Sequence, residues 1–317
     1  MKLSIHMLAY NHEKYIAQAI DSVLMQEVNF PYELVIGEDC STDDTRNIVK
    51  SYKDKYPDII RLLLHEKNIG MMMNSKQTRE LCSGEYIAEL EGDDYWTSPK
   101  KLQMQVDFLD VHPDFSICFH PVLINYDGML GKDNHIYPEN IKGISTLEDI
   151  LENNFIPTCS VMYRNYLINE FPDWFYKLKM GDWPLNILNA RHGKIKYLNN
   201  VMGVYRIHPS GVWSSLNKTS VLEGNIEAYK CINSYFNFKY RRIIYNKLAD
   251  SYFKLALLYE ENNDFNLARK YILNSMSCCL YANNIPHVGA CKLFSRVYMP
   301  FSFRLYCAIK KLIKQNK

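Results

Sequence analysis

Three carboxylates stand within four positions of this chain, at Glu91, Asp93 and Asp94. They directly follow the strand-like run of residues 85–90, so the sequence places them where a buried strand ends. Buried negative charge is costly unless it is neutralised, and carboxylate oxygens are the ligands that suit Mg²⁺ or Mn²⁺. We therefore expect the cluster to hold a divalent cation. The alternative is an acidic loop that caps a helix beginning near Pro99.

Polar residues also follow three earlier strand-like segments. Apolar runs at residues 3–8, 33–36, 59–64 and 86–90 alternate with helical patterns. This order predicts an α/β fold with a mostly parallel sheet flanked by helices, in which ligands bind beyond the carboxyl ends of the strands. The residues at the first three of these ends are Ala9, Tyr10, Asn11, Glu38, Asp39, Asn68 and Gly70.

Composition narrows the class of protein. The chain has 317 residues, 47% of them hydrophobic, which is enough for a full core and a second small domain. A net charge of +2 predicts no nucleic-acid partner, and nine cysteines without metal-ligand spacing indicate free thiols. The chain opens on a strand rather than a signal peptide and has no apolar run of about 20 residues. We expect a cytoplasmic protein, with the inner face of the cell membrane as the alternative location.

The sequence excludes two common nucleotide sites. It contains neither a G-x-G-x-x-G dinucleotide fingerprint after the first strand nor a G-x-x-x-x-G-K-[ST] phosphate loop. Acidic strand ends suit a different chemistry, since Asp39 can accept hydrogen bonds from a base or ribose, and Asp93 and Asp94 can hold a cation against a diphosphate. That cation would offset charge on a departing nucleoside diphosphate. The chemistry predicted is group transfer from an activated nucleotide donor.

Three segments of the chain, residues 4–15, 38–45 and 84–96, resemble family 2 glycosyltransferases of the GT-A fold. The resemblance covers about residues 1–215 and implies a nucleotide-sugar donor, with a UDP-sugar favoured. The family motif D-D-x-S-x-D-x-T contacts the nucleoside; Glu38 replaces its first aspartate, which leaves Asp39 for that contact. In the D-x-D motif Glu91 replaces the first aspartate. The resemblance implies a metal on Asp93 and Asp94, with Glu91 nearer the ribose.

One family segment is missing. The Ala-Arg-Asn sequence usual before the fourth strand is replaced by residues 73–77, Met-Asn-Ser-Lys-Gln. Lys76 and Arg79 are the candidate replacements for its diphosphate-binding arginine. The alternative is that both are solvated charges on a helix.

Residues 99–215 are expected to receive the acceptor, after the nucleotide-sugar half at residues 1–98. Strands are predicted at residues 116–124 and 159–163, with a variable loop over residues 126–144 between them. Asp182 follows a glycine and precedes an aromatic residue at a helix start. In related transferases an acid at this point is the catalytic base, which takes the proton of the acceptor hydroxyl. Capping of the helix is the alternative and is compatible with catalysis.

A strand pair, residues 197–198 and 201–208, is predicted to follow. Arg206 could reach a phosphate. His208 could complete the metal shell or bind the diphosphate, as a histidine after this strand does in some family members; the alternative is a polar surface residue. Trp213 fits either a lid that stacks on a sugar or simple packing, and His12 is expected to have no ligand role.

Residues 216–317 are predicted to form a helical extension. They contain one tetratricopeptide-like hairpin, with its turn at residues 262–264, that must pack on the catalytic domain or on a protein partner. The stretch of residues 293–317 is basic and amphipathic, which fits peripheral membrane contact or a solvated terminal helix equally.

We therefore expect a metal-dependent, inverting glycosyltransferase that acts by single displacement in bacterial cell-surface polysaccharide synthesis. Its acceptor would be a glycan or a lipid-linked sugar. Two alternatives remain open: a non-catalytic nucleotide-sugar-binding scaffold, and a sugar-phosphate nucleotidyltransferase. The latter would carry a glycine-rich loop after the first strand, where this chain has Ala9, Tyr10 and Asn11.

Overall fold

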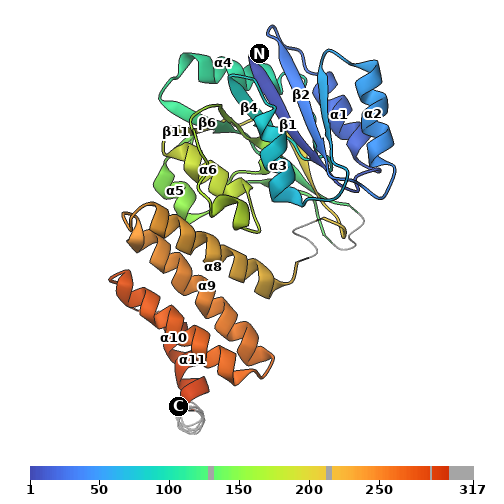
Figure 1. The fold of residues 1–317 in the computed structure, drawn as a ribbon. Helices are drawn as coiled ribbons and strands as arrows, with labels where there is room; N and C mark the ends of the chain where they lie inside the picture. Colours follow the sequence, from blue (N-terminus) through green and yellow to red (C-terminus); the bar gives the residue numbers. More distant parts are fainter. Residues whose placement is uncertain (128–131, 212–215, 286–287, 300–317) are drawn as a thin grey trace. The chain divides into compact units, whose positions relative to one another are not determined.

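The computed structural model describes residues 1–127, 132–211, 216–285 and 288–299. The chain divides into two compact units, Met1–Ser215 and Leu216–Lys317 (Figure 1). Trp213 and most of the basic stretch of residues 293–317 lie outside the described residues. The predictions made for them stay predictions.

An eight-stranded sheet forms the centre of the first unit (Figure 1), in the order β3-β2-β1-β4-β10-β6-β11-β9. Strand β1 pairs in parallel with β2 and β4, and β10 runs antiparallel between β4 and β6. The carboxyl ends of the parallel strands therefore meet at one edge, which confirms the predicted α/β sheet. The strands are β1 (Leu3–Ala9), β2 (Tyr32–Glu38), β3 (Ile60–Leu64), β4 (Tyr86–Glu89), β6 (Phe115–Phe119), β9 (Ile144–Ser145), β10 (Met162–Arg164) and β11 (Lys194–Tyr197).

Helices cover both faces of this sheet. In β1, Leu3, Ile5 and Met7 are buried in one hydrophobic core with residues of α1 and α4. Side chains alternate along a strand, so His6 points to the opposite face, toward α3: its Nε2 lies 3.2 Å from the backbone oxygen of Ser75. The strand is buried on both faces, although the polar Ser4 and His6 interrupt the apolar run that is typical of such a strand. The helices are α1 (Ile16–Leu24), α2 (Thr45–Lys55), α3 (Met71–Glu80) and α4 (Lys101–Val111).

A second sheet corrects three predictions, the first being the variable loop over residues 126–144, which contains a strand at His135–Tyr137. Its order is β5 (Tyr95–Trp96), β12 (Gly203–Ile207), β7 (Val122–Tyr126) and β8 (His135–Tyr137). The single strand predicted over residues 116–124 is wrong, because β6 and β7 lie in different sheets and Pro121, which has no N–H to donate, stands between them. The predicted pairing of residues 197–198 with 201–208 is also wrong: β11 pairs with β6 and β9, and β12 pairs with β5 and β7.

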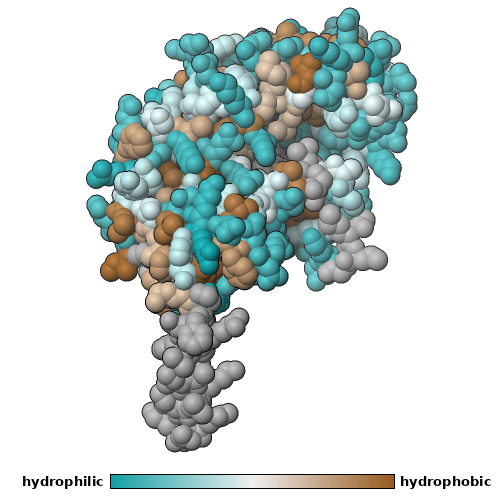
Figure 2. Space-filling model, turned by 60° about the horizontal axis from the view of Figure 1, so that its bottom comes forward, coloured by the Kyte–Doolittle hydropathy of each residue, from teal (hydrophilic) through white to brown (hydrophobic). Residues whose placement is uncertain are grey.

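Two helices of the first unit, α5 (Leu147–Glu152) and α6 (Asp182–Ala190), follow in the acceptor half. The second unit contains α8 (Lys218–Tyr235), α9 (Arg241–Glu261), α10 (Phe265–Tyr281) and α11 (Val288–Tyr298). Ala256, Ile272 and Leu293 form part of its own core, and the Asp264 side chain caps α10. The surface seen in Figure 2 is mostly hydrophilic with scattered hydrophobic residues. None of the helices within the described ranges is long and apolar enough to cross a membrane.

Replacement of Lys101 by methionine is expected to stabilise the protein. Lys101 is fully buried, and its Nζ lies 3.7 Å from the Trp96 ring centroid without a hydrogen-bond partner in the described part of the chain. Burial lowers the pKa of Lys101 to about 7. In the unfolded chain the Lys101 amine stays protonated up to about pH 10.4. Because burial disfavours the charged amine, the native state loses stability as the pH falls from about 10.4 to about 7.

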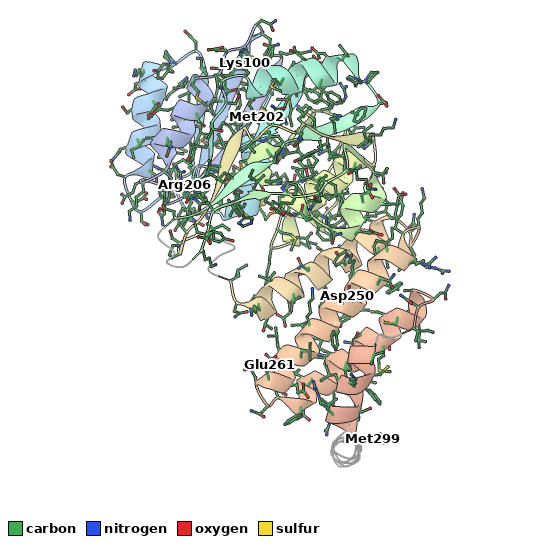
Figure 3. All side chains as sticks on the ribbon, turned by 180° about the vertical axis from the view of Figure 1, so that it is seen from behind. Lys100, Met202, Arg206, Asp250, Glu261 and Met299 are labelled. Carbon is green, nitrogen blue, oxygen red and sulfur yellow. The ribbon has the colours of Figure 1, made fainter. Side chains whose placement is uncertain are left out.

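Urea unfolding should therefore give Lys101→Met a higher free energy of unfolding than the wild type, by more at pH 7 than at pH 10. The matched control is Lys100→Met, at the exposed neighbour labelled in Figure 3, where we expect a change within about 0.5 kcal/mol. A Lys101→Met variant less stable than the wild type at pH 7 would contradict this account of the buried amine.

Candidate functional site

The turn between β4 and β5 gathers three acids. One oxygen from each of Glu91, Asp93 and Asp94 lies within 4.8 Å of the others. The turn is pressed against β1, because the Gly92 N–H donates to the Leu8 carbonyl at 2.9 Å. A Cβ at Gly92 would lie 2.7 Å from His12 Nδ1 and 2.8 Å from Ile16 Cδ1, so only glycine fits here. The close approach of the turn to β1 holds the carboxylates at the sheet edge.

Asp94 is buried with half of its carboxylate unsatisfied. Its Oδ1 accepts the Arg206 backbone N–H at 2.8 Å, whereas Oδ2 is buried and accepts no N–H or O–H hydrogen bond in the regions that the structure describes. The Cys159 thiol, a weak donor, lies close enough to the Asp94 carboxyl to interact with it. Burial and then the charge of Asp93 raise the pKa of Asp94 well above its usual range. Burial and the charges of Asp93 and Asp94 do the same to the pKa of Glu91. Both carboxyls resist ionisation unless positive charge is brought to them.

Asp93 is the member of the cluster that ionises most readily. His208 Nε2 lies 3.1 Å from its Oδ2, and His12 Nε2 lies 3.7 Å from the same oxygen. Burial acts to raise the pKa of Asp93, but the His208 hydrogen bond and the two imidazoles outweigh it and hold that pKa below its ordinary value. His208 also bonds Ser210 Oγ through Nδ1, at 2.9 Å. The structure thus brings together the residues predicted to hold metal, Asp93, Asp94 and His208.

Arg206, on β12, contacts the acidic turn through its side chain. Its Nη1 donates to the Asp93 backbone carbonyl and its Nη2 to Gln18 Oε1. The guanidinium lies 5.0 Å from the Tyr15 ring centroid and 4.3 Å from that of Tyr95. Figure 3 shows Arg206 on its strand in the first unit. These contacts make Arg206 a support of the acidic turn; its predicted contact with a phosphate stays a prediction.

The first two strand ends are joined to each other. Asn11, with a left-handed backbone at φ +57°, accepts the Thr42 N–H at 2.8 Å through Oδ1, and its own N–H donates to Ser41 Oγ at 3.0 Å. Ala9 is buried at the end of β1, whereas the Tyr10 side chain is 43% exposed. Of these predicted contacts, Tyr10 and Asn11 are therefore exposed at the rim, whereas Ala9 is not.

The third strand end is tied to the second by Asp39. Its Oδ1 accepts the Ile69 N–H at 2.8 Å, and its Oδ2 accepts the Gly70 N–H at 2.9 Å. The Gly70 N–H also lies 3.1 Å from Asn68 Oδ1, and Gly70 has a φ of +84°, which favours glycine. Each carboxylate oxygen has two lone-pair positions, so Asp39 keeps the capacity to accept further donors.

Asp182 begins α6 at the acceptor side of the rim. The Asn154 Nδ2 donates to its Oδ2 at 3.2 Å. Burial raises the pKa of Asp182, against the hydrogen bonds from the Trp183 backbone and Asn154, which lower it. Asp182 lies close enough for its charge to raise the pKa of Glu91. A carboxyl with a raised pKa is suited to accept a proton near neutral pH.

Two buried glutamates near the rim are fully paired. Glu38 bonds the Ser41 N–H at 2.6 Å and forms an ion pair with Arg46 at 2.5 Å. Glu89 forms an ion pair with Arg79 at 2.8 Å. The positive charges of Arg79 and His6 overcome its burial and hold the pKa of Glu89 at about 2. These acids stabilise the sheet edge and are compensated without a ligand.

This pairing bears on the missing arginine segment. The Arg79 guanidinium is engaged by Glu89 and by the Tyr163 hydroxyl, so its donors are turned inward. The Lys76 ammonium lies 5.2 Å from the Tyr176 ring centroid. Neither contact requires a phosphate, and the role of both residues as replacements stays a prediction.

The comparisons with known proteins agree with this geometry. Residues 4–171, more than half of the chain, match the family described as Glycosyl transferase family 2. The chain belongs to this family. An uncharacterized protein of Mycobacterium bovis is 40% identical over 214 residues, 67% of this chain, and the chain spans 61% of the length of that relative.

One further relative and one solved structure are informative. The Escherichia coli protein WfgD, named a UDP-Glc:alpha-D-GlcNAc-diphosphoundecaprenol beta-1,3-glucosyltransferase, is 31% identical over 67% of this family 2 chain and 80% of its own. The crystal structure of S. aureus TarS 1-349 in complex with UDP-GlcNAc has a TM-score of 0.56 and 21% identity, covering 87% of this chain and 91% of that one. That likeness supports the fold, and the sheet and family predictions are confirmed.

Sequence reasoning missed three residues of this site. Sequence patterns assign His12 no ligand role, yet its ring lies beside Asp93, with a buried Nδ1 that has no partner within the described residues. The second missed residue is Tyr205: burial and the nearby negative charges of Asp94 and Glu91 raise the pKa of its hydroxyl. The third is Asn154, which donates to Asp182 and belongs to no sequence motif. The position of His12 follows from its close packing against Gly92, and a single sequence does not reveal that contact.

Proposed function

We propose that this chain transfers a sugar from a nucleotide-diphosphate sugar to a hydroxyl of a glycan or lipid-linked acceptor in cell-surface polysaccharide synthesis. The proposal rests on two different acidic sites that lie at the same edge of the sheet. One is the under-compensated cluster of Glu91, Asp93 and Asp94, and the other is the single carboxyl of Asp182. The name of WfgD, with a sugar on diphosphoundecaprenol, supports the lipid-linked class of acceptor.

The acidic cluster fits a divalent cation. The buried Asp94 Oδ2 accepts no N–H or O–H hydrogen bond from the described chain, and Asp93 offers an ionised carboxylate beside it. We propose Asp93 and Asp94 as the ligands of Mg²⁺ or Mn²⁺, with His208 at the edge of the shell and Glu91 nearer the ribose. Such an ion supplies electrostatic stabilisation of the leaving diphosphate.

The donor nucleoside is assigned to the linked loops of the first three strands. Asp39 fixes the segment of residues 68–70 and retains acceptor positions for base or ribose groups. Ala9, Tyr10, Asn11 and Glu38 shape the adjoining wall. A UDP-sugar is the favoured donor, which agrees with the donor in the name of WfgD.

Asp182 is proposed as the catalytic base of an inverting reaction. The acceptor hydroxyl loses its proton to Asp182 as its oxygen bonds the anomeric carbon and the bond to the diphosphate oxygen breaks. A single displacement of this kind inverts that carbon. The hydrogen bond from Asn154 holds the carboxylate in place for proton transfer.

Asp182→Asn should abolish transfer and leave donor binding intact, because the amide cannot accept the proton. UDP release would be measured from UDP-glucose, UDP-galactose and UDP-GlcNAc with octyl glycosides as acceptors. We expect at least about a 100-fold fall in kcat with the UDP Kd within about twofold. The exposed Asp173→Asn serves as control. Full activity in Asp182→Asn would remove the base assignment, and no transfer by the wild type would favour the scaffold alternative.

Mn²⁺ alone should raise the thermal midpoint of the wild type at pH 7.5, by relieving repulsion in the acidic cluster. Glu91 and Asp94 have raised pKa values, so stability without metal is full at low pH and falls as the pH rises through them. Asp94→Asn should raise the metal-free midpoint and remove the Mn²⁺ shift. The matched control is Asp58→Asn, at an exposed position. An undiminished Mn²⁺ shift in Asp94→Asn would contradict the ligand assignment.

A further inference from the structure

Tyr137 is linked to the proposed base through one residue. The Tyr137 hydroxyl donates to the backbone carbonyl of Asn154 at 2.9 Å, and the Asn154 Nδ2 donates to Asp182 Oδ2 at 3.2 Å. Burial and then the charge of Asp182 raise the pKa of Tyr137, which places the phenol near that carboxyl. No sequence motif marks this link, since β8 lies inside the segment predicted as a variable loop.

The Tyr137 ring is held in place and yet open to solvent. Tyr137 ends β8, the edge strand of the second sheet, and its side chain is 37% exposed. It pairs across the sheet with the buried Val122, whereas its neighbour Ile136 pairs with Leu123 and points to the opposite face. Because the hydroxyl is bonded to Asn154, the ring is fixed before any ligand arrives.

We propose that Tyr137 is the specificity-determining platform on which the acceptor sugar lies next to Asp182; this inference rests on the proposed function. A pyranose has an apolar face of C–H groups and a rim of hydroxyls. A tyrosine ring offers a rigid apolar surface at low entropic cost, and polar groups beside it fix the orientation of the ligand. At this position the Asn154 amide and the Asp182 carboxylate are those polar groups.

A purely structural role of Tyr137 makes a different prediction. If Tyr137 acts only by propping Asn154 through its hydroxyl, loss of that hydroxyl has the same effect as loss of the whole ring. A platform requires the ring and tolerates loss of the hydroxyl. Tyr137→Phe and Tyr137→Ala therefore separate the two roles, and Ile136→Ala, on the opposite face of the same exposed strand, is the matched control.

The test uses the full chain with octyl β-D-glucoside, octyl β-D-galactoside and octyl N-acetyl-β-D-glucosaminide. Saturation-transfer NMR measures glycoside binding without turnover, and UDP release gives the kinetic constants. Tyr137→Ala should raise the acceptor KM about tenfold or more, weaken glycoside binding equally, and leave the donor KM and acceptor-free UDP-sugar hydrolysis within about twofold. Tyr137→Phe and Ile136→Ala should keep acceptor KM values within about threefold of the wild type.

Each outcome decides the inference separately from the proposed function. An unchanged acceptor KM and unchanged binding in Tyr137→Ala would overturn the platform, as would equal losses in Tyr137→Phe and Tyr137→Ala. A wild type that binds none of the glycosides would overturn it too. If the wild type binds a glycoside through Tyr137 but consumes no UDP-sugar, the platform stands and the transfer activity fails.

Discussion

Repulsion among the three carboxylates of the turn between β4 and β5 is the constraint around which the first unit is arranged. Asp93 is kept ionised by His208 and His12, while Glu91 and Asp94 have raised pKa values. The pairing of β12 with β5 delivers the Arg206 N–H to Asp94 and the Arg206 guanidinium to the backbone of Asp93. The second sheet thus supports the acidic turn of the first, and the proposed cation would complete the balance of charge.

The buried acids of the rim fall into two physical kinds. Glu38 and Glu89 are each paired with an arginine, and the pairing with Arg79 holds the pKa of Glu89 at about 2. Asp94 keeps a buried oxygen that accepts no N–H or O–H hydrogen bond in the described chain, and the weakly donating Cys159 thiol leaves the pKa of Asp94 raised. Burying a carboxylate in this way costs free energy that a purely structural residue has no reason to incur. The contrast distinguishes acids whose charge is paired within the fold from acids whose charge the described chain leaves under-compensated.

The sequence was sufficient for the parallel half of the fold and for the acidic cluster, because both depend on local patterns. Apolar runs of β1 to β4 alternate with amphipathic helices, and the acids follow β4 directly. The antiparallel half was harder: Pro121 separates β6 from β7 within a stretch that reads as one strand, and the partners of β11 and β12 are set by long-range packing. Contacts across the chain, such as Asn154 with Asp182, leave no periodic signal.

The most direct test of this account is calorimetric titration of UDP into the full wild-type chain, with Mn²⁺ and then with the metal chelated. The acidic cluster is proposed to meet the diphosphate only through a cation, since carboxylates and phosphates repel one another directly. We predict a saturable heat of binding with Mn²⁺ that weakens at least about tenfold on chelation, a loss of about 1.4 kcal/mol. Equal affinity for UDP under both conditions would contradict the central role given to the acidic turn.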